Sequence, residues 1–125
     1  MIYLDTHVAA RLFEGIRSSI SAEAQAAIEQ DDDLRISPIV QLEMEYLHEI
    51  KRLRLPAARI FATLQAEIGL RVCDAPFPTV IQQALDERWT RDPFDRIIVA
   101  QARVNDAVLI TLDRTIQRHY PNALA

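Results

Sequence analysis

The feature that most constrains the fold is a regular alternation of short apolar runs with longer helical segments. The clearest runs, residues 2–4 and 108–110, are continuously apolar. Such runs are typical of strands buried on both faces of a parallel sheet. We therefore predict an α/β fold, a three-layer α/β/α arrangement with a mostly parallel four- to five-stranded sheet. We expect strands at residues 2–4, 34–37, 70–73 and 108–110, and helices at 6–14, 21–30, 38–54, 56–68, 79–88, 92–105 and 114–118.

The length and composition indicate one compact unit. The chain has 125 residues, half of them hydrophobic, and it shows no repeat, linker or low-complexity tract, so we expect a single domain spanning residues 1–125. The apolar N-terminal run ends at Asp5, no segment is long enough to span a bilayer, and Cys73 is the only cysteine. We expect a cytoplasmic protein without a membrane segment.

The net charge of −4 argues against nucleic-acid binding through the overall field, because carboxylates and phosphates repel. A protein of this charge that binds RNA needs a local source of positive charge. A divalent cation is one source. Arginines are another, and we single out Arg88, Arg91, Arg114 and Arg118.

Glu43 occupies an unusual place on the long helix predicted from Pro38. At about 100° per residue, Ile39, Val40, Tyr46, Leu47 and Ile50 all fall within about 60° of it, so Glu43 is expected at the centre of the apolar face. An unpaired buried carboxylate costs several kcal/mol. It is therefore either a structural salt bridge to an arginine or a functional carboxylate.

Three further acids could likewise have either a structural or a functional role. Asp95 lies in the first turn of a helix that is apolar on two sides, where it could also simply favour the helix dipole. Asp5 and Asp113 each follow a predicted strand and precede a helix, so each could be only an N-cap. In a parallel sheet, however, both would lie at the same edge, where ligands gather. Thr6 and Thr111 lie beside them and could orient the carboxylates.

Four acids gathered in one pocket would repel each other unless cations were present. Mg²⁺ prefers oxygen ligands and is usually held by few carboxylates, water and substrate phosphate. This is the chemistry of metal-assisted phosphodiester hydrolysis. The acids Asp5, Glu43, Asp95 and Asp113 are therefore our candidate catalytic and metal-binding residues.

Four stretches of the chain also carry a recognisable pattern. They are residues 2–7 (IYLDTH), 36–43 (ISPIVQLE), 89–102 (WTRDPFDRIIVAQA) and 109–113 (LITLD). In order and spacing they resemble PIN-domain nucleases, specifically the VapC-like toxins of bacterial toxin–antitoxin pairs. The resemblance covers nearly the whole chain.

The resemblance implies a Mg²⁺- or Mn²⁺-dependent endoribonuclease whose four acids map onto Asp5, Glu43, Asp95 and Asp113. It also implies a homodimer and a cognate antitoxin that wraps the toxin and blocks the site. Thr6 and Thr111 match polar positions beside the acids, Arg96 matches a basic position that could pair with them, and Asp92 is a fifth acid whose capping role already explains it. In one departure, Leu112 stands where some similar sequences have lysine.

Two other interpretations remain. The chain could be a catalytically silent PIN-like module that binds a partner through its apolar helices, with the acids serving only as caps. It could instead be a phosphoacceptor signalling domain, but such a domain needs adjacent acids after the first strand, and Asp5 stands alone. We also expect apolar residues between 38 and 68 to extend outward as a dimer or antitoxin surface, namely Leu53, Leu55, Ile60, Phe61 and Leu64.

Overall fold

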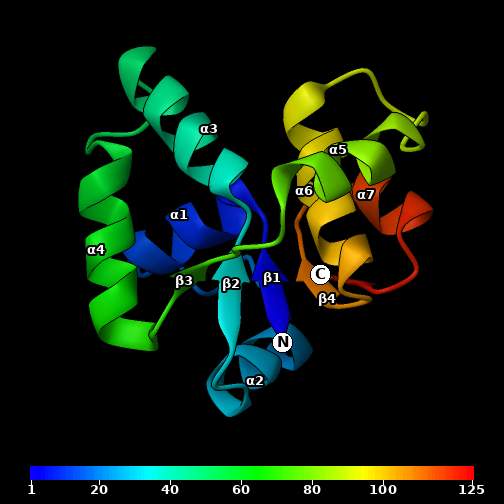
Figure 1. The fold of residues 1–125 in the computed structure, drawn as a ribbon. Helices are drawn as coiled ribbons and strands as arrows, with labels where there is room; N and C mark the ends of the chain where they lie inside the picture. The colour runs from blue at the N-terminus through cyan, green and yellow to red at the C-terminus, as the bar shows by residue number, and fades with distance from the viewer.

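The computed structural model describes residues 1–125 and consists of a central sheet with helices around it (Figure 1). In chain order the elements are β1 (Ile2–Leu4), α1 (Thr6–Glu14), α2 (Ala22–Gln30), β2 (Leu34–Ile36), α3 (Pro38–Glu49), α4 (Ala57–Ile68), β3 (Arg71–Val72), α5 (Phe77–Leu85), α6 (Pro93–Val104), β4 (Val108–Ile110), α7 (Arg114–His119) and β5 (Ala123–Leu124). None of the helices combines the length and the apolar character needed to cross a bilayer.

The sheet confirms the predicted fold class. Its five strands are ordered β3-β2-β1-β4-β5, and every neighbouring pair is parallel. The chain builds outward from β1 to β3 and then crosses back to β4 on the other side of β1. The strand order therefore reverses between β1 and β4, and Figure 1 shows α1, α3 and α4 grouped on one side and α5, α6 and α7 on the other.

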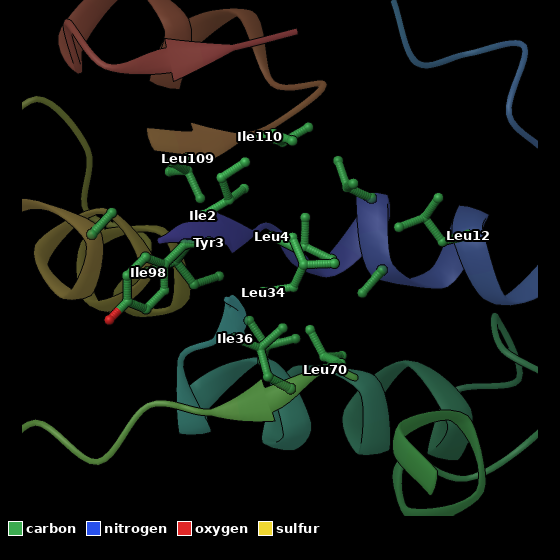
Figure 2. Close-up of a cluster of buried hydrophobic side chains, with 14 of the residues drawn as sticks. Ile2, Tyr3, Leu4, Leu12, Leu34, Ile36, Leu70, Ile98, Leu109 and Ile110 are labelled. Atoms are coloured by element: carbon green, nitrogen blue, oxygen red, sulfur yellow. The ribbon is translucent and has the colours of Figure 1, made fainter. Parts of the chain in front are cut away.

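The core is built around β1, which is the central strand. Figure 2 shows Tyr3 and Leu4 lying between Leu109 of β4 and Leu34 of β2. All four side chains are at most 2% exposed. Apolar residues in unbroken runs thus fill the space on both faces of the strand, as the continuous hydrophobic pattern predicts.

The predicted orientation of α3 is partly wrong. Its buried stripe is Val40, Met44 and Leu47, which places Glu43 half-buried at the edge of the stripe rather than at its centre. Tyr46 and Ile50, expected on the buried face, are exposed. The helix also ends at Glu49, before the predicted residue 54. The chain turns there, with a left-handed φ of 66° at Lys51.

A buried ion pair anchors the loop between α5 and α6, which leads into Asp92. The carboxylate of Glu87 is almost fully buried and accepts hydrogen bonds from Nε of Arg103 and Nε1 of Trp89, both at 2.6 Å. The Trp89 ring stacks on His119 at 5.2 Å between centroids. The Arg103 guanidinium lies 4.9 Å from the centre of the Tyr120 ring. Glu87 therefore ties this loop to α6 and to the end of α7.

Replacing Glu87 by alanine should lower the free energy of unfolding by about 2–3 kcal/mol, because Arg103 and the Trp89 N–H lose their acceptor. Urea denaturation measures the change. The neighbouring Asp86 is a matched control, since its side chain is exposed and lies 3.9 Å from Arg88. Asp86→Ala should change stability by less than about 0.5 kcal/mol. Equal effects of the two substitutions would contradict the anchoring role.

Candidate active site

The candidate site lies where β1 and β4 end side by side. Leu4 is paired with Ile110 in register, and the backbone N–H of Asp5 donates to the carbonyl of Ile110 at 3.0 Å. Asp5 and Thr111 are therefore neighbours at the carboxyl edge of the sheet. In open parallel sheets, ligands bind beyond this edge at the point where the strand order reverses, and β1 and β4 form that point here.

Asp5 is a buried carboxylate held from two sides. One oxygen accepts the backbone N–H of Thr6 at 2.8 Å, and the other accepts the hydroxyl of Thr111 at 2.6 Å. Burial raises the pKa of Asp5 above its ordinary value, and the two hydrogen bonds oppose the rise. Asp5 thus caps α1, as the sequence suggested, but its second oxygen also joins β1 to β4 through the hydroxyl of Thr111.

Thr6 links Asp5 to Glu43 on α3. Its hydroxyl donates to a carboxylate oxygen of Glu43 at 2.5 Å, while its backbone N–H donates to Asp5. Burial raises the pKa of Glu43, and the nearby charge of Asp5 raises it further. Thr6 thereby holds two carboxylates from different parts of the chain next to one another.

Thr111 makes the matching connection to Asp113. Its hydroxyl oxygen accepts the backbone N–H of Asp113 at 3.0 Å and donates to Asp5. The carboxylate of Asp113 caps α7 by accepting the N–H groups of Thr115 at 2.7 Å and Ile116 at 3.2 Å. A continuous hydrogen-bonded series therefore runs from Glu43 through Thr6, Asp5 and Thr111 to Asp113.

Asp95 completes the group without joining that series. It lies half-buried in the first turn of α6, and its carboxylate makes no hydrogen bond within the protein. Burial has the largest effect, and together with the charges of Asp92, Asp5, Asp113 and Glu43, in that order of size, it raises the pKa of Asp95 to about 7. Asp92 caps α6 by accepting the N–H of Phe94 at 2.9 Å. The structure therefore brings all five predicted acids into electrostatic contact.

No arginine or lysine pairs with any of these acids. The salt-bridge interpretation of Glu43 is therefore wrong. The expected pairing of Arg96 with the site is also wrong, because its guanidinium donates to the carbonyls of Ala84 and Leu85 at the end of α5, each at 3.0 Å. The positive neighbour that the charges do reveal is His7, which lowers the pKa of both Asp5 and Glu43. The only sequence signal for this role of His7 is its position two residues after Asp5.

The donor set fits a hard divalent cation. It consists of carboxylate and hydroxyl oxygens, and the carboxylates are held close together without basic partners, so a cation would relieve their repulsion. The side chains do not form a ready-made group of three or more acidic, histidine or cysteine ligands. An ion held here would thus keep much of its coordination for water and phosphate oxygens, as Mg²⁺ commonly does.

The charge on Asp95 should destabilise the protein in the absence of metal. Its carboxyl has a pKa of about 7 in the folded chain and about 4 in an unfolded one. The folded state therefore holds more protons between these values, and the free energy of unfolding falls as the pH rises through them. Asp95→Asn should raise Tm by a few degrees at pH 8 in EDTA and by clearly less at pH 5.

Thermal unfolding followed by circular dichroism at the two pH values measures this difference. Asp86→Asn, an exposed site outside the acidic group, is the control and should give the same shift at both. A pH-independent shift in Tm for Asp95→Asn would contradict the idea that the charge of Asp95 destabilises the folded protein.

Comparison with known proteins shows the family of the chain. The model of the PIN domain family matches residues 2–121. Ribonuclease VapC22 of Mycobacterium tuberculosis (strain ATCC 25618 / H37Rv) is 32% identical over 120 residues, covering 94% of this chain and 91% of that protein.

Two solved structures share the fold. A chain of a toxin–antitoxin complex from Klebsiella pneumoniae superposes with a TM-score of 0.70 at 20% identity, covering 100% of this chain and 97% of that one. A chain of VapBC2 from Rickettsia felis, bound to a DNA fragment from its promoter, gives 0.67 at 17% identity, with 99% and 96% covered. With a family model spanning almost its whole length and a close relative among the VapC proteins, the chain belongs to the PIN-domain family as a VapC-like member.

Proposed function

We propose that the protein is an endoribonuclease that depends on Mg²⁺ or Mn²⁺ and acts as the toxin of a toxin–antitoxin pair. The observation that carries this proposal is the set of acids without basic partners at the β1–β4 edge, whose charges help to raise the pKa of Glu43 and Asp95. A relative with 32% identity is a ribonuclease by name. Structural caps alone would not require acids from four separate segments to converge.

In this proposal Asp5, Glu43, Asp95 and Asp113 are the metal ligands. A bound divalent ion supplies an activated water and neutralises charge on the scissile phosphate. Thr6 and Thr111 are positioning residues, because each hydroxyl fixes a carboxylate by a hydrogen bond of 2.5–2.6 Å. Asp92 supports the site by capping α6 and by adding negative charge beside Asp95.

Cleavage of total cellular RNA, with and without Mn²⁺, tests the activity. Asp5→Asn should lower the rate by about 100-fold or more, because it removes a charged ligand while an amide oxygen can still accept from Thr111. Asp86→Asn should cleave at the wild-type rate. Metal-independent cleavage, or full activity of Asp5→Asn, would contradict the mechanism.

Mn²⁺ should also raise the Tm of the wild-type protein, since a ligand that binds only the folded state stabilises it. This shift should be smaller in Asp5→Asn. A wild-type protein that neither cleaves RNA nor gains stability from Mn²⁺ would instead be the catalytically silent interaction module.

We propose that the antitoxin binds a groove between α1 and the segment joining α3 to α4. The groove has a volume of about 720 Å³ and a floor that includes Phe13, Leu53 and Leu55. Two arginines, Arg52 and Arg54, and one acid, Glu14, also line it, so its charged residues are net positive. The prediction that Ile60 and Leu64 extend outward is wrong, because both are buried in the core. An apolar segment carrying acidic residues fits this combination of an apolar floor and a net positive charge.

Replacing both Arg52 and Arg54 by glutamate should weaken antitoxin binding by about tenfold or more at 0.15 M salt, because like charges then face each other. Isothermal titration with the product of a small neighbouring reading frame measures the affinity. Arg118→Glu, a charge reversal of the same kind on α7, is the control and should bind normally. Unchanged affinity of the double variant would place the antitoxin elsewhere.

We also propose a homodimer, whose contact surface is the patch formed by Leu42 on α3 and Phe77 on α5. Both side chains are more than half exposed, and they line one hollow of about 290 Å³. Large apolar side chains gathered on one surface favour association with a partner. A surface that binds its own copy through a two-fold axis needs no second patch.

A further inference from the structure

An aromatic pair spans the two helices that carry Glu43 and Asp95. The ring of Tyr46 on α3 stacks on the ring of Phe94 on α6, with centroids 6.1 Å apart and planes inclined by 28°. Tyr46 follows Glu43 by about one helical turn, and Phe94 directly precedes Asp95. The pair therefore lies at the rim of the acidic site and joins α3 to α6, the helices that carry Glu43 and Asp95.

The pair is open to solvent. Tyr46 is 48% exposed, and its hydroxyl makes no hydrogen bond within the protein, while Phe94 is half-buried. Leu42 and Ile50 continue the same exposed stripe of α3 at intervals of four residues, but neither is an aromatic ring at the site. One broad, flat, partly supported aromatic surface is thus available to a ligand.

The charges around the pair select the kind of ligand. Glu43 and Asp95 stand beside it, and Arg96, the basic residue nearest to Asp95 in sequence, is bound to the end of α5. A phosphate is therefore disfavoured on the rings themselves. A nucleobase is flat, uncharged and polarisable, and stacking on an aromatic side chain stabilises it without any positive charge.

We propose that Tyr46, supported by Phe94, is a stacking platform for one unpaired base of single-stranded RNA. The inference rests on the proposed nuclease function and adds to it a residue that binds a base. Residues three apart on a helix have Cβ atoms about 5–6 Å apart, so the stacked base would belong to a nucleotide next to the phosphate that a cation at Glu43 would hold. A base-paired duplex keeps its bases stacked inside the helix, and a ring at the rim reaches only bases that are unpaired.

Two oligomers of equal charge isolate the stacking. One is fluorescein-labelled hexaadenylate RNA, and the other is the same ribose–phosphate chain without bases. Fluorescence anisotropy in 0.15 M salt, with Ca²⁺ in place of Mn²⁺ so that a cation remains at the acids, measures the affinity for each oligomer. The wild-type protein should prefer the hexaadenylate by roughly 5- to 150-fold, the range that stacking of one base provides.

Tyr46→Ala should remove most of this preference, and Tyr46→Trp should retain it. Ile50→Ala, one turn further along the same stripe, is the matched control and should behave as wild type. With Mn²⁺ present, Tyr46→Ala should raise KM for single-stranded RNA with little change in kcat, and the Mn²⁺-induced rise in Tm should be unaffected.

Equal affinity of the wild-type protein for the two oligomers would overturn the platform even if the protein cleaves RNA. The nuclease proposal fails separately, through absence of cleavage and of Mn²⁺ stabilisation. If light scattering shows that Tyr46→Ala lowers the molecular mass while the base preference is kept, the ring belongs to an interface between copies, and the platform is likewise overturned.

Discussion

The rest of the site depends on a single buried carboxylate, that of Asp5, at the junction of β1 and β4. Each of its oxygens has one donor, the N–H of Thr6 or the hydroxyl of Thr111. Burial of a carboxylate is costly without such donors. Because the two threonines also contact Glu43 and Asp113, the hydrogen bonds that make Asp5 tolerable in the core also set the positions of the neighbouring acids. The same two threonines thus support the buried Asp5 and position the acids next to it.

Asp33 and Glu87, two acids outside the candidate site, are paired with arginines, whereas the acids within it are not. Asp33 accepts hydrogen bonds from Arg35 and Arg71, which lower its pKa to about 2. Glu87 is paired with Arg103 in the core. Asp95 has no such partner, and burial with four like charges raises its pKa to about 7. The chain has arginines enough to pair every acid of the site, so their absence there costs stability that a cation would restore.

The sequence predicts the fold well because the signals for it are local. Continuous apolar runs define β1 and β4, and the Asp92–Pro93 pair marks the start of α6. What sequence analysis misses depends on neighbours distant in the chain. β5 has only two residues and exists because it pairs with β4. Arg96 donates hydrogen bonds to carbonyls at the end of α5, and no sequence pattern predicts this contact. The helical wheel of α3 correctly finds an apolar helix but shifts its buried stripe, because packing against α4, α6 and α1 buries Met44 and leaves Tyr46 exposed.

That shift has a functional consequence. Had Tyr46 been buried instead of Met44, the turn of α3 that follows Glu43 would present no aromatic ring to a ligand. With Met44 in the core instead, the turn that follows Glu43 carries an open aromatic ring. Cation-mediated attraction acts on phosphate and is screened by salt. Stacking acts on bases and is insensitive to charge, so under the proposed function the two contributions would add.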